Sequence, residues 1–212
     1  RDTGAAMSNG TRGVMTITHA PSGVFNVIHY VTIAATGNSL DFGDLVNPGG
    51  RHHGASSPTR GIVFAGYGPG PAFNYTNHID YITISTTGNS IDFGDKVQKN
   101  AHGASFSNAI RGVVGGGLGP EPAYDYTRVI QYVTMATLGN SIDYGDLSYD
   151  SRILGASSSP TRGVFGGGLT PSLLDNISYI QIMTGGTSID FGNLITAGYG
   201  VSGLSNGHGG LG

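Results

Sequence analysis

The chain has 212 residues, of which 38% are hydrophobic, so it can bury a core, and its length suits one domain of the all-β type. Only 11% of its residues are charged and its net charge is −3, which provides no positive surface for nucleic acid or an anionic membrane. Cysteine is absent, which excludes disulfides, thiolate zinc sites and thiol nucleophiles, and no apolar run approaches the ~20 residues of a membrane-spanning helix.

The sequence repeats itself with a period of about 50 residues, which is typical of solenoids and propellers. Each unit has an Arg-Gly pair near its start and an Asp-aromatic-Gly motif near its end. The arginines are Arg12, Arg60, Arg111 and Arg162. The aspartates are Asp41, Asp92, Asp143 and Asp190. We therefore predict one domain over residues 1–212, with repeats at about 4–53, 54–102, 103–154 and 155–200 and a partial repeat at 201–212.

Each unit is predicted to hold four short strands. In the second unit, the first strand is the small-residue stretch 54–56, and the second strand begins at Arg60. The third strand is the β-branched run 81–85, and the fourth is 90–93, entered through a Gly-Asn pair. That pair tolerates positive φ and is a hairpin signal. No part of the unit has the 3.6-residue period of a helix.

The third strand indicates how the sheets pack. Its apolar residues fall on both faces, as in Ile79 to Ile84, whereas a sheet with one wet face would alternate cleanly. A propeller blade is covered by a neighbour on each side. Glycine and alanine in the first strand suit a position near the crowded axis. We predict an all-β fold, a β-propeller of four-stranded antiparallel blades with four full repeats and a half repeat, giving four to five blades.

The order of residues within a unit resembles the Kelch repeat. In the second unit, Arg51 precedes the stretch 53–56, and a hydrophobic strand at 62–64 follows. Paired glycines end the second strand most clearly at 115–116 and 166–167. An aromatic residue stands in the last strand, where the Kelch family has tryptophan. These aromatic residues are Phe42, Phe93, Tyr144 and Phe191.

Three motifs follow one another in the repeat: Thr-Arg-Gly-Val-Phe-Gly-Gly-Gly, as at 161–168, then Ile-x-Tyr-Val-Thr-Ile-Ala-Thr, then Gly-Asn-Ser-x-Asp-Phe-Gly-Asp-Leu. With these motifs the repeat is also similar to propeller-type repeats in virion and tail-fibre proteins of marine bacteriophages. The similarity covers nearly the whole chain and implies a location on a virion or another extracellular surface. The implied partners are other virion or surface protein subunits, with a host glycan as a further candidate. The partial repeat at 201–212 is expected to pair with a segment of a longer chain or of a neighbouring subunit and so complete a fifth blade.

Two roles are open for the repeated aspartates, which we expect to lie in tight turns. Calcium binding is one, because calcium prefers hard oxygen ligands, but two carboxylates per turn are few for its roughly six to eight ligands. Capping of the turn's own backbone is the other. We favour capping, and we predict no metal site and no cofactor.

The repeated arginines also allow two interpretations. We expect each guanidinium to bridge to an aspartate of a neighbouring blade, because the fork of the guanidinium matches a carboxylate. The alternative is a ring of arginines that faces an anionic sugar or protein partner.

The loops after the second strand are the predicted site of any ligand. They are rich in glycine and proline, they vary between units, and loops on a rigid scaffold usually carry recognition. Their aromatic side chains are Tyr67, Phe73, Tyr75, Tyr124 and Tyr126. A lectin would lose its affinity for sugar when Tyr75 or Tyr126 is replaced by alanine.

No enzyme is predicted. The Asp-Phe-Gly triplet lacks the glycine loop and catalytic-loop residues of a kinase, and His52-His53 cannot share a metal from adjacent strand positions. A copper-bearing propeller oxidase would need a cysteine ligand. The leading prediction is a structural or adhesive virion or surface protein that mediates contact with proteins or a host surface. The alternative is a carbohydrate-binding propeller lectin.

Overall fold

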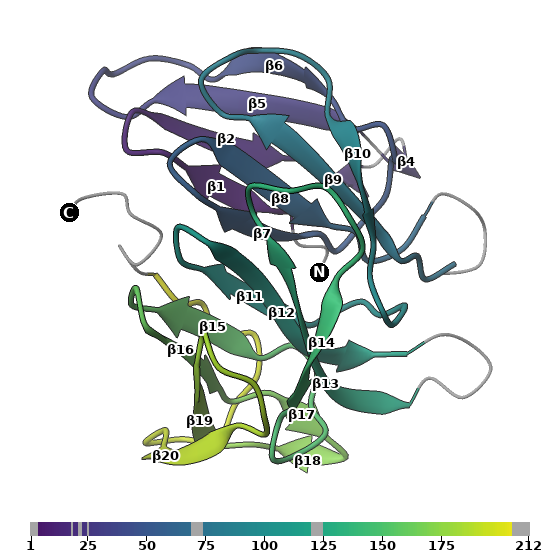
Figure 1. Cartoon of the computed structure of the whole chain (residues 1–212), viewed down its shortest axis with the longest axis vertical. Coiled ribbons are helices and arrows are strands. Elements are labelled where there is room, and N and C mark those ends of the chain that lie inside the picture. Colours follow the sequence, from purple (N-terminus) through teal and green to yellow (C-terminus); the bar gives the residue numbers. More distant parts are fainter. Residues whose placement is uncertain are drawn as a thin grey trace.

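The computed structural model shows four four-stranded antiparallel sheets, which confirms the predicted all-β propeller (Figure 1). It describes residues 4–17, 19–20, 23–24, 26–68, 74–119 and 125–204. No helix occurs in these ranges, and accordingly none is long and apolar enough to cross a membrane.

Blades 1 and 2 are built from the first two repeats, and each runs in space in chain order from the innermost to the outermost strand. Blade 1 consists of β1 (Ala6–Ser8), β2 (Arg12–Thr16), β5 (Val27–Thr32) and β6 (Leu40–Asp44). Blade 2 consists of β7 (His53–Ser56), β8 (Arg60–Phe64), β9 (His78–Thr83) and β10 (Ile91–Asp95).

Blades 3 and 4 repeat this order. Blade 3 consists of β11 (Ala104–Ser107), β12 (Arg111–Leu118), β13 (Tyr126–Thr134) and β14 (Ile142–Asp146). Blade 4 consists of β15 (Gly155–Ser158), β16 (Arg162–Gly166), β19 (Asn176–Gln181) and β20 (Ile189–Asn193). Two short hairpins project between second and third strands: β3 (His19–Ala20) with β4 (Gly23–Val24), and β17 (Leu169–Thr170) with β18 (Ser172–Leu173).

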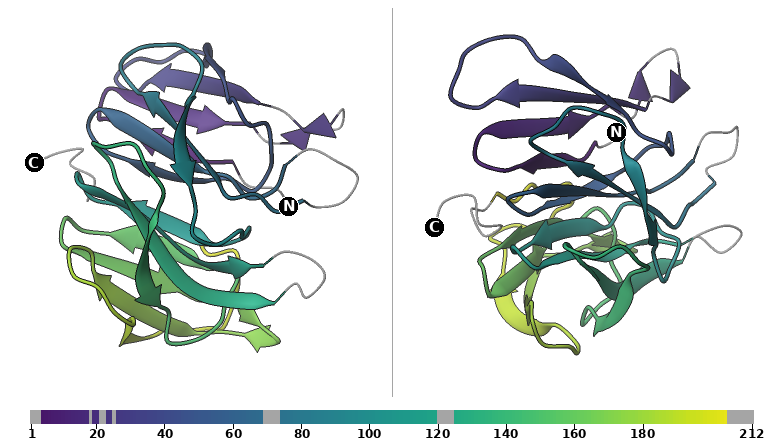
Figure 2. Two further views of the ribbon diagram at one scale, coloured as in Figure 1. Left: turned by 45° about the vertical axis from the view of Figure 1, so that its right-hand side comes forward. Right: turned by 45° about the horizontal axis from the view of Figure 1, so that its top comes forward.

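The four innermost strands, β1, β7, β11 and β15, line a central channel of about 280 Å³. They follow one another through the molecule, and the four sheets fan outward from them (Figures 1 and 2). Serine hydroxyls join the strands. Ser107 Oγ accepts from Ser56 N at 3.0 Å and donates to Ser56 O at 2.8 Å, while Ser158 Oγ donates to Ser107 O at 2.8 Å. Small first-strand residues therefore allow backbones to pack closely at the axis.

The core lies between blades as well as within them. Ile79 and Ile82 of the third strand are both buried, which confirms that this sheet is covered on both sides. Phe106 of blade 3 and Phe165 of blade 4 have ring centroids 5.0 Å apart. Each blade therefore depends on its neighbour for the burial of its apolar side chains.

The Gly-Asn-Ser segments of blades 2 and 3, and the equivalent Gly-Thr-Ser segment at 186–188 in blade 4, join each of these blades to the one before it. Gly139 N of blade 3 donates to Phe93 O of blade 2 at 2.9 Å. Ser141 N donates to Asp95 O at 2.8 Å, and Asp95 N donates to Asn140 Oδ1 at 3.0 Å. Each hairpin loop thus satisfies the free edge of the preceding outer strand, which would otherwise be open to pairing with another chain.

Candidate ligand-binding site

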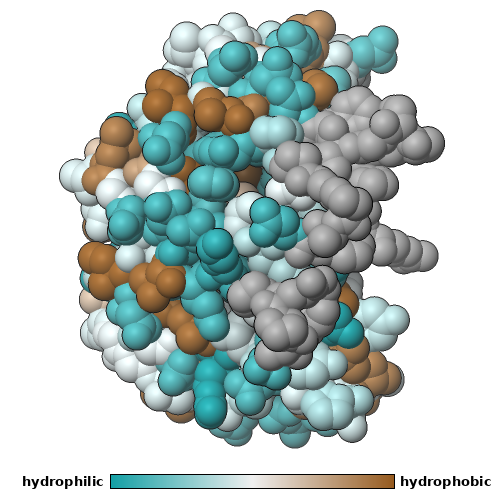
Figure 3. Space-filling view, turned by 90° about the vertical axis from the view of Figure 1, so that its right-hand side faces the viewer, coloured by the Kyte–Doolittle hydropathy of each residue, from teal (hydrophilic) through white to brown (hydrophobic). Residues whose placement is uncertain are grey.

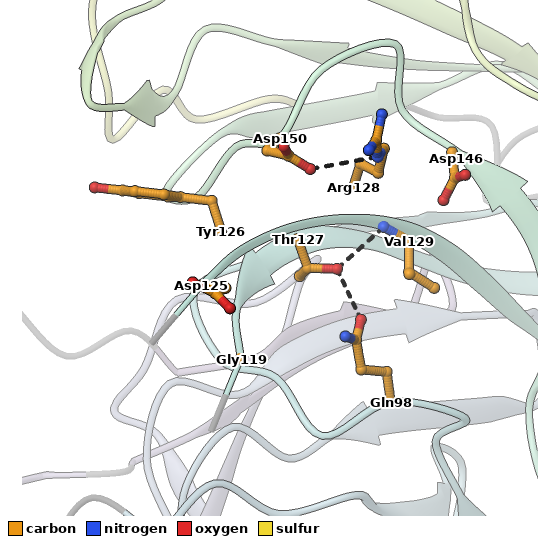
Figure 4. A pocket seen from close by; sticks show the side chains of 9 residues that line it. All are labelled: Gln98, Gly119, Asp125, Tyr126, Thr127, Arg128, Val129, Asp146 and Asp150. Atoms are coloured by element: carbon orange, nitrogen blue, oxygen red, sulfur yellow. Dashed lines mark hydrogen bonds and ion pairs between the residues drawn. The ribbon is translucent and has the colours of Figure 1, made fainter. Parts of the chain in front are cut away.

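A hollow of about 370 Å³ lies at the end of blade 3 where β12 leads to β13 (Figure 4). Its walls come from the junction of blades 2 and 3, from β13 and from the segment after β14. The lining residues are Gln98, Gly119, Asp125, Tyr126, Thr127, Arg128, Val129, Asp146 and Asp150. The volume is within the size class of small-molecule sites, which span roughly 300–1,000 Å³.

The backbone of β13 positions one polar wall. Thr127 is buried, and its hydroxyl donates to Gln98 Oε1 at 2.7 Å while accepting from Val129 N at 3.2 Å. Figure 4 shows Gln98 reaching Thr127 from the side opposite Arg128 and Asp150. With its oxygen held in this way, the amide of Gln98 has a fixed orientation and an NH2 group that can donate to a ligand.

The hollow is acidic. Arg128 Nε lies 3.4 Å from Asp150 Oδ1, and both side chains are exposed, so this pair adds little to stability and can exchange partners. The carboxylates of Asp125 and Asp146 form no ion pair among the described residues. Three carboxylates against one guanidinium favour a ligand that donates hydrogen bonds, such as a polyol, over a phosphate or another anion.

Tyr126 provides the aromatic part of the hollow. Its ring packs against the buried cluster that contains Ala101 and Leu118, and the guanidinium of Arg152 lies 5.4 Å from its centroid. The side chain is half-buried, so its position is set by packing, and in Figure 4 its ring extends away from the other lining side chains. A fixed aromatic ring beside a few polar groups is a common arrangement in ligand sites.

Of the three predicted aromatic residues that the structure describes, only Tyr126 lines this hollow. Tyr67 and Tyr75 are each only 5% exposed and face each other across a β-bridge. Because they leave almost no surface for a ligand, we assign them a packing role instead. Phe73 and Tyr124 lie outside the described residues.

The repeated arginines bridge blades, but the acceptor is a backbone carbonyl and not the expected aspartate. Arg12 Nη1 donates to Ile84 O at 3.1 Å. Arg60 and Arg111 make the same contact with Met135 O at 3.0 Å and with Ile182 O at 2.8 Å. Each of the four guanidiniums also lies over the third-strand tyrosine of its own blade, between 4.0 and 4.9 Å from the ring centroid. This placement favours the structural role over a ring that faces a ligand.

The repeated aspartates lie in the outermost strands and not in turns. Asp92 and Asp143 accept from the backbone N–H groups of Gly94 at 3.2 Å and Gly145 at 3.0 Å, which is the capping contact that we favoured. Asp41 and Asp190 occupy the same position in β6 and β20. No group of three or more acidic or histidine side chains suited to a metal occurs in the described part of the chain.

The polar residues of the hollow were not predicted from the sequence. None of these residues is repeated identically at the equivalent position of the other units, although Asn47 of the first unit is also an amide. They are Gln98, Asp125, Arg128 and Asp150. A search for repeated residues therefore passes over them. The only sequence signal for these residues is that they depart from the shared pattern next to the variable loops.

The fold and the hollow define a β-propeller with a ligand-sized site at a loop end. No protein family matches this sequence, and no curated protein is detectably similar to it. Among solved structures, YjhT is similar in fold: the TM-score is 0.73 and the sequence identity 12%, over 97% of this chain and 70% of the YjhT chain. At this identity the likeness extends to the fold alone.

Proposed function

We propose that this protein is a non-enzymatic structural or adhesive component of a virion or another extracellular surface, where it contacts other protein subunits or a host surface. The observation that carries the proposal is a rigid scaffold of interlocked blades with a polar, aromatic hollow at a loop end. The repeat's resemblance to Kelch propellers and to phage virion and tail-fibre repeats supports the same setting.

The surface beside the loops favours polar recognition. On the side of the molecule that is on the right in Figure 1, apolar residues of the described part form separate small patches within a hydrophilic surface (Figure 3). A large continuous apolar patch would instead favour a stable hydrophobic interface with another protein. Contact through hydroxyl and amide groups therefore suits this face best.

A carbohydrate-binding lectin is the second candidate, and the acidic hollow beside Tyr126 specifically favours it. Sugar hydroxyls donate to carboxylates, and the apolar face of a pyranose packs on an aromatic ring. Asp125 and Asp146 form no ion pair among the described residues, and three carboxylates outnumber the guanidinium of Arg128, which favours a neutral sugar over a sialylated one.

A glycan array probed with the folded protein tests both candidates. Binding to neutral glycans that is lost in Tyr126→Ala, with an unchanged melting temperature, would support the lectin. The matched variant is Asn38→Ala, an exposed residue of blade 1 remote in the chain from the hollow, which should leave binding unchanged. A clean negative would reject the lectin and leave protein contact. That remaining role would fail if the folded protein bound no protein of its source virion or cell surface.

A further inference from the structure

Each blade has a forward face, which is turned toward the next blade, and a rear face, which is turned toward the preceding one. At all three junctions the forward face provides the second-strand arginine, the aromatic residue of the outermost strand and the free edge of that strand. The rear face provides a carbonyl for the arginine and the loop before the outermost strand. The three junctions are copies of one interface, so together they show which groups a forward face binds.

The forward face of blade 4 is open. Phe191 is 55% exposed, whereas its equivalents Phe42, Phe93 and Tyr144 are 3%, 3% and 6% exposed. A Cβ atom placed on Gly145 would overlap the backbone of Gly186 in the next blade, but one on Gly192 would meet nothing within 4 Å. The surface of β20 is therefore free to make the contact that β6, β10 and β14 make with the loop of the following blade.

Arg162 shows the same incompleteness. Its guanidinium lies 4.6 Å from the centroid of the Tyr179 ring, as in the other blades. Unlike Arg60 and Arg111, it donates no hydrogen bond to a carbonyl of a following blade within the described residues. It is also exposed, so its donors are directed to solvent.

The innermost position of the next blade is already occupied by residues 201–204. Ser157 Oγ donates to Leu204 O at 2.7 Å, and Gly203 packs on the backbone of Ala156 as Gly54 packs on Ala6. Leu204 is 96% exposed. A second copy that docked its blade 1 here would bring β1 into this same position, so a complete blade does not fit without displacing the segment.

We propose that the forward face of blade 4 binds a β-hairpin with the third- and fourth-strand pattern of this repeat, which pairs its Gly-Asn-Ser loop with β20. Such a hairpin provides a carbonyl for Arg162, covers Phe191, and leaves residues 201–204 in place. The partner is a single antiparallel hairpin of the kind seen at 78–95, and this inference does not depend on the proposed function.

The observed junctions predict which atoms become protected. Asp44 N donates to Asn89 Oδ1 at 3.0 Å, and Val46 N donates to Ser90 Oγ at 2.8 Å. The equivalent amides in blade 4 belong to Asn193 and Ile195. Because an isolated hairpin is marginally stable, it is best tested tethered, where a flexible linker provides an effective concentration of about millimolar.

The experiment fuses a copy of residues 77–97 to the N-terminus of the full chain through a Gly/Ser linker and measures amide hydrogen exchange by NMR. We expect exchange at Asn193 and Ile195 to slow at least tenfold relative to the unfused chain. The matched control carries Asn89→Ala and Ser90→Ala in the tethered copy only, which removes both side-chain acceptors. It should restore the exchange rates of the unfused chain at these two amides.

The amides of Asp44 and Val46 serve as an internal measure of folding, and their slow exchange must be kept in every variant. With these amides protected, unchanged exchange at Asn193 and Ile195 in the fusion overturns the proposal. It is also overturned if the unfused chain already protects both amides and sediments as a dimer, because a second copy would then fill the face.

Discussion

The glycine of each Arg-Gly pair has a steric reason that the sequence alone does not show. In blades 2, 3 and 4 this glycine lies under a side chain from the innermost strand of the preceding blade. At Gly163, a Cβ atom would overlap the ring of Phe106, which is itself buried and cannot move aside. At Gly13 in blade 1, the nearest atom to a Cβ would be Val31 Cγ2 at 3.4 Å, an ordinary contact.

We therefore expect Gly163→Ala to destabilise the protein by about 1–3 kcal/mol, the range for overpacking a core, and Gly13→Ala to change stability by less than about 0.5 kcal/mol. Neither glycine has a positive φ, so backbone strain does not separate the two variants. Urea unfolding measures both free energies. Equal losses at the two positions would show that the close approach of Phe106 is not the reason for the glycine.

Lys96 is a buried lysine with no acidic partner among the described residues. Its Nζ donates to Ala65 O at 2.6 Å, to Asn100 O at 2.7 Å and to Asn100 Oδ1 at 2.8 Å, and it forms no ion pair among the described residues. Burial lowers the pKa of Lys96 from 10.5 to about 7. The equivalent residue in every other blade is leucine, which indicates the cost of the charge at this position.

This lysine should make stability depend on pH. Between pH 7 and about 10.4 the unfolded chain binds a proton at Lys96 that the folded chain does not, so the lysine's contribution to stability rises with pH. We expect the free energy of unfolding of the wild type, relative to Lys96→Leu, to increase by up to about 1.4 kcal/mol per pH unit in this window. Urea unfolding at several pH values measures the difference. Parallel profiles for the two proteins would contradict it.

At the scale of the element, the second strand carries a charged hydrogen bond between blades. Arg111 places its guanidinium 4.0 Å from the centroid of Tyr132 and donates to Ile182 O across the junction. Hydrogen bonds of charged groups contribute more than neutral ones, at about 1.5–3 kcal/mol each. Within the described part of the chain the guanidinium of Arg162 makes only the ring contact, which is worth roughly 0.5–1 kcal/mol at an exposed site.

Comparison of two variants separates these contributions. We expect Arg111→Ala to lower the free energy of unfolding by about 2–4 kcal/mol, because it removes both contacts, and Arg162→Ala to lower it by no more than about 1 kcal/mol. Thermal unfolding monitored by near-ultraviolet circular dichroism reports both. A loss at Arg162 as large as that at Arg111 would indicate that the hydrogen bond across the junction contributes nothing.

The elements themselves were largely predictable, because each strand carries its own signal. In the second unit the small-residue first strand and the Gly-Asn pair lie where they were expected. The third strand, expected at 81–85, is His78–Thr83, and the fourth, expected at 90–93, is Ile91–Asp95. What the repeat pattern could not show is which atoms meet across a junction. The repeat spacing of the arginines is the same whether each guanidinium binds a carbonyl or an aspartate of the next blade. The carbonyl acceptor is therefore known only from the positions of β9, β13 and β19.

The candidate site was predictable only through Tyr126. Aromatic residues in variable loops indicated the end of the blades where the candidate hollow lies, but exposure cannot be inferred from loop composition. Tyr67 and Tyr75 fill space beside a β-bridge instead of facing solvent. The polar walls depend on where the junction at Gln98 and the segment at Asp150 return in space, which is a tertiary property with no local sequence signal.

For the whole molecule, the open face of blade 4 implies uneven stability. A repeat protein is stabilised by its units and by the interfaces between them, and each of blades 2 and 3 has two such interfaces. No loop of a following blade covers the outer strand β20 among the described residues, and Phe191 is exposed. Opening of β20 therefore breaks fewer contacts than opening of β14, whose edge is bound by Gly186 and Ser188.

We expect native-state hydrogen exchange to reveal this gradient in the unmodified chain. Amides of β20 and of its partner β19 should exchange through local opening, with free energies lower by about 2 kcal/mol or more than those of β13 and β14, which should approach the global value. The difference follows from the missing interface and should disappear in any assembly that covers Phe191. Uniform exchange across blades 3 and 4 in a monomeric sample would mean that the junctions contribute little and that each blade is stable by itself.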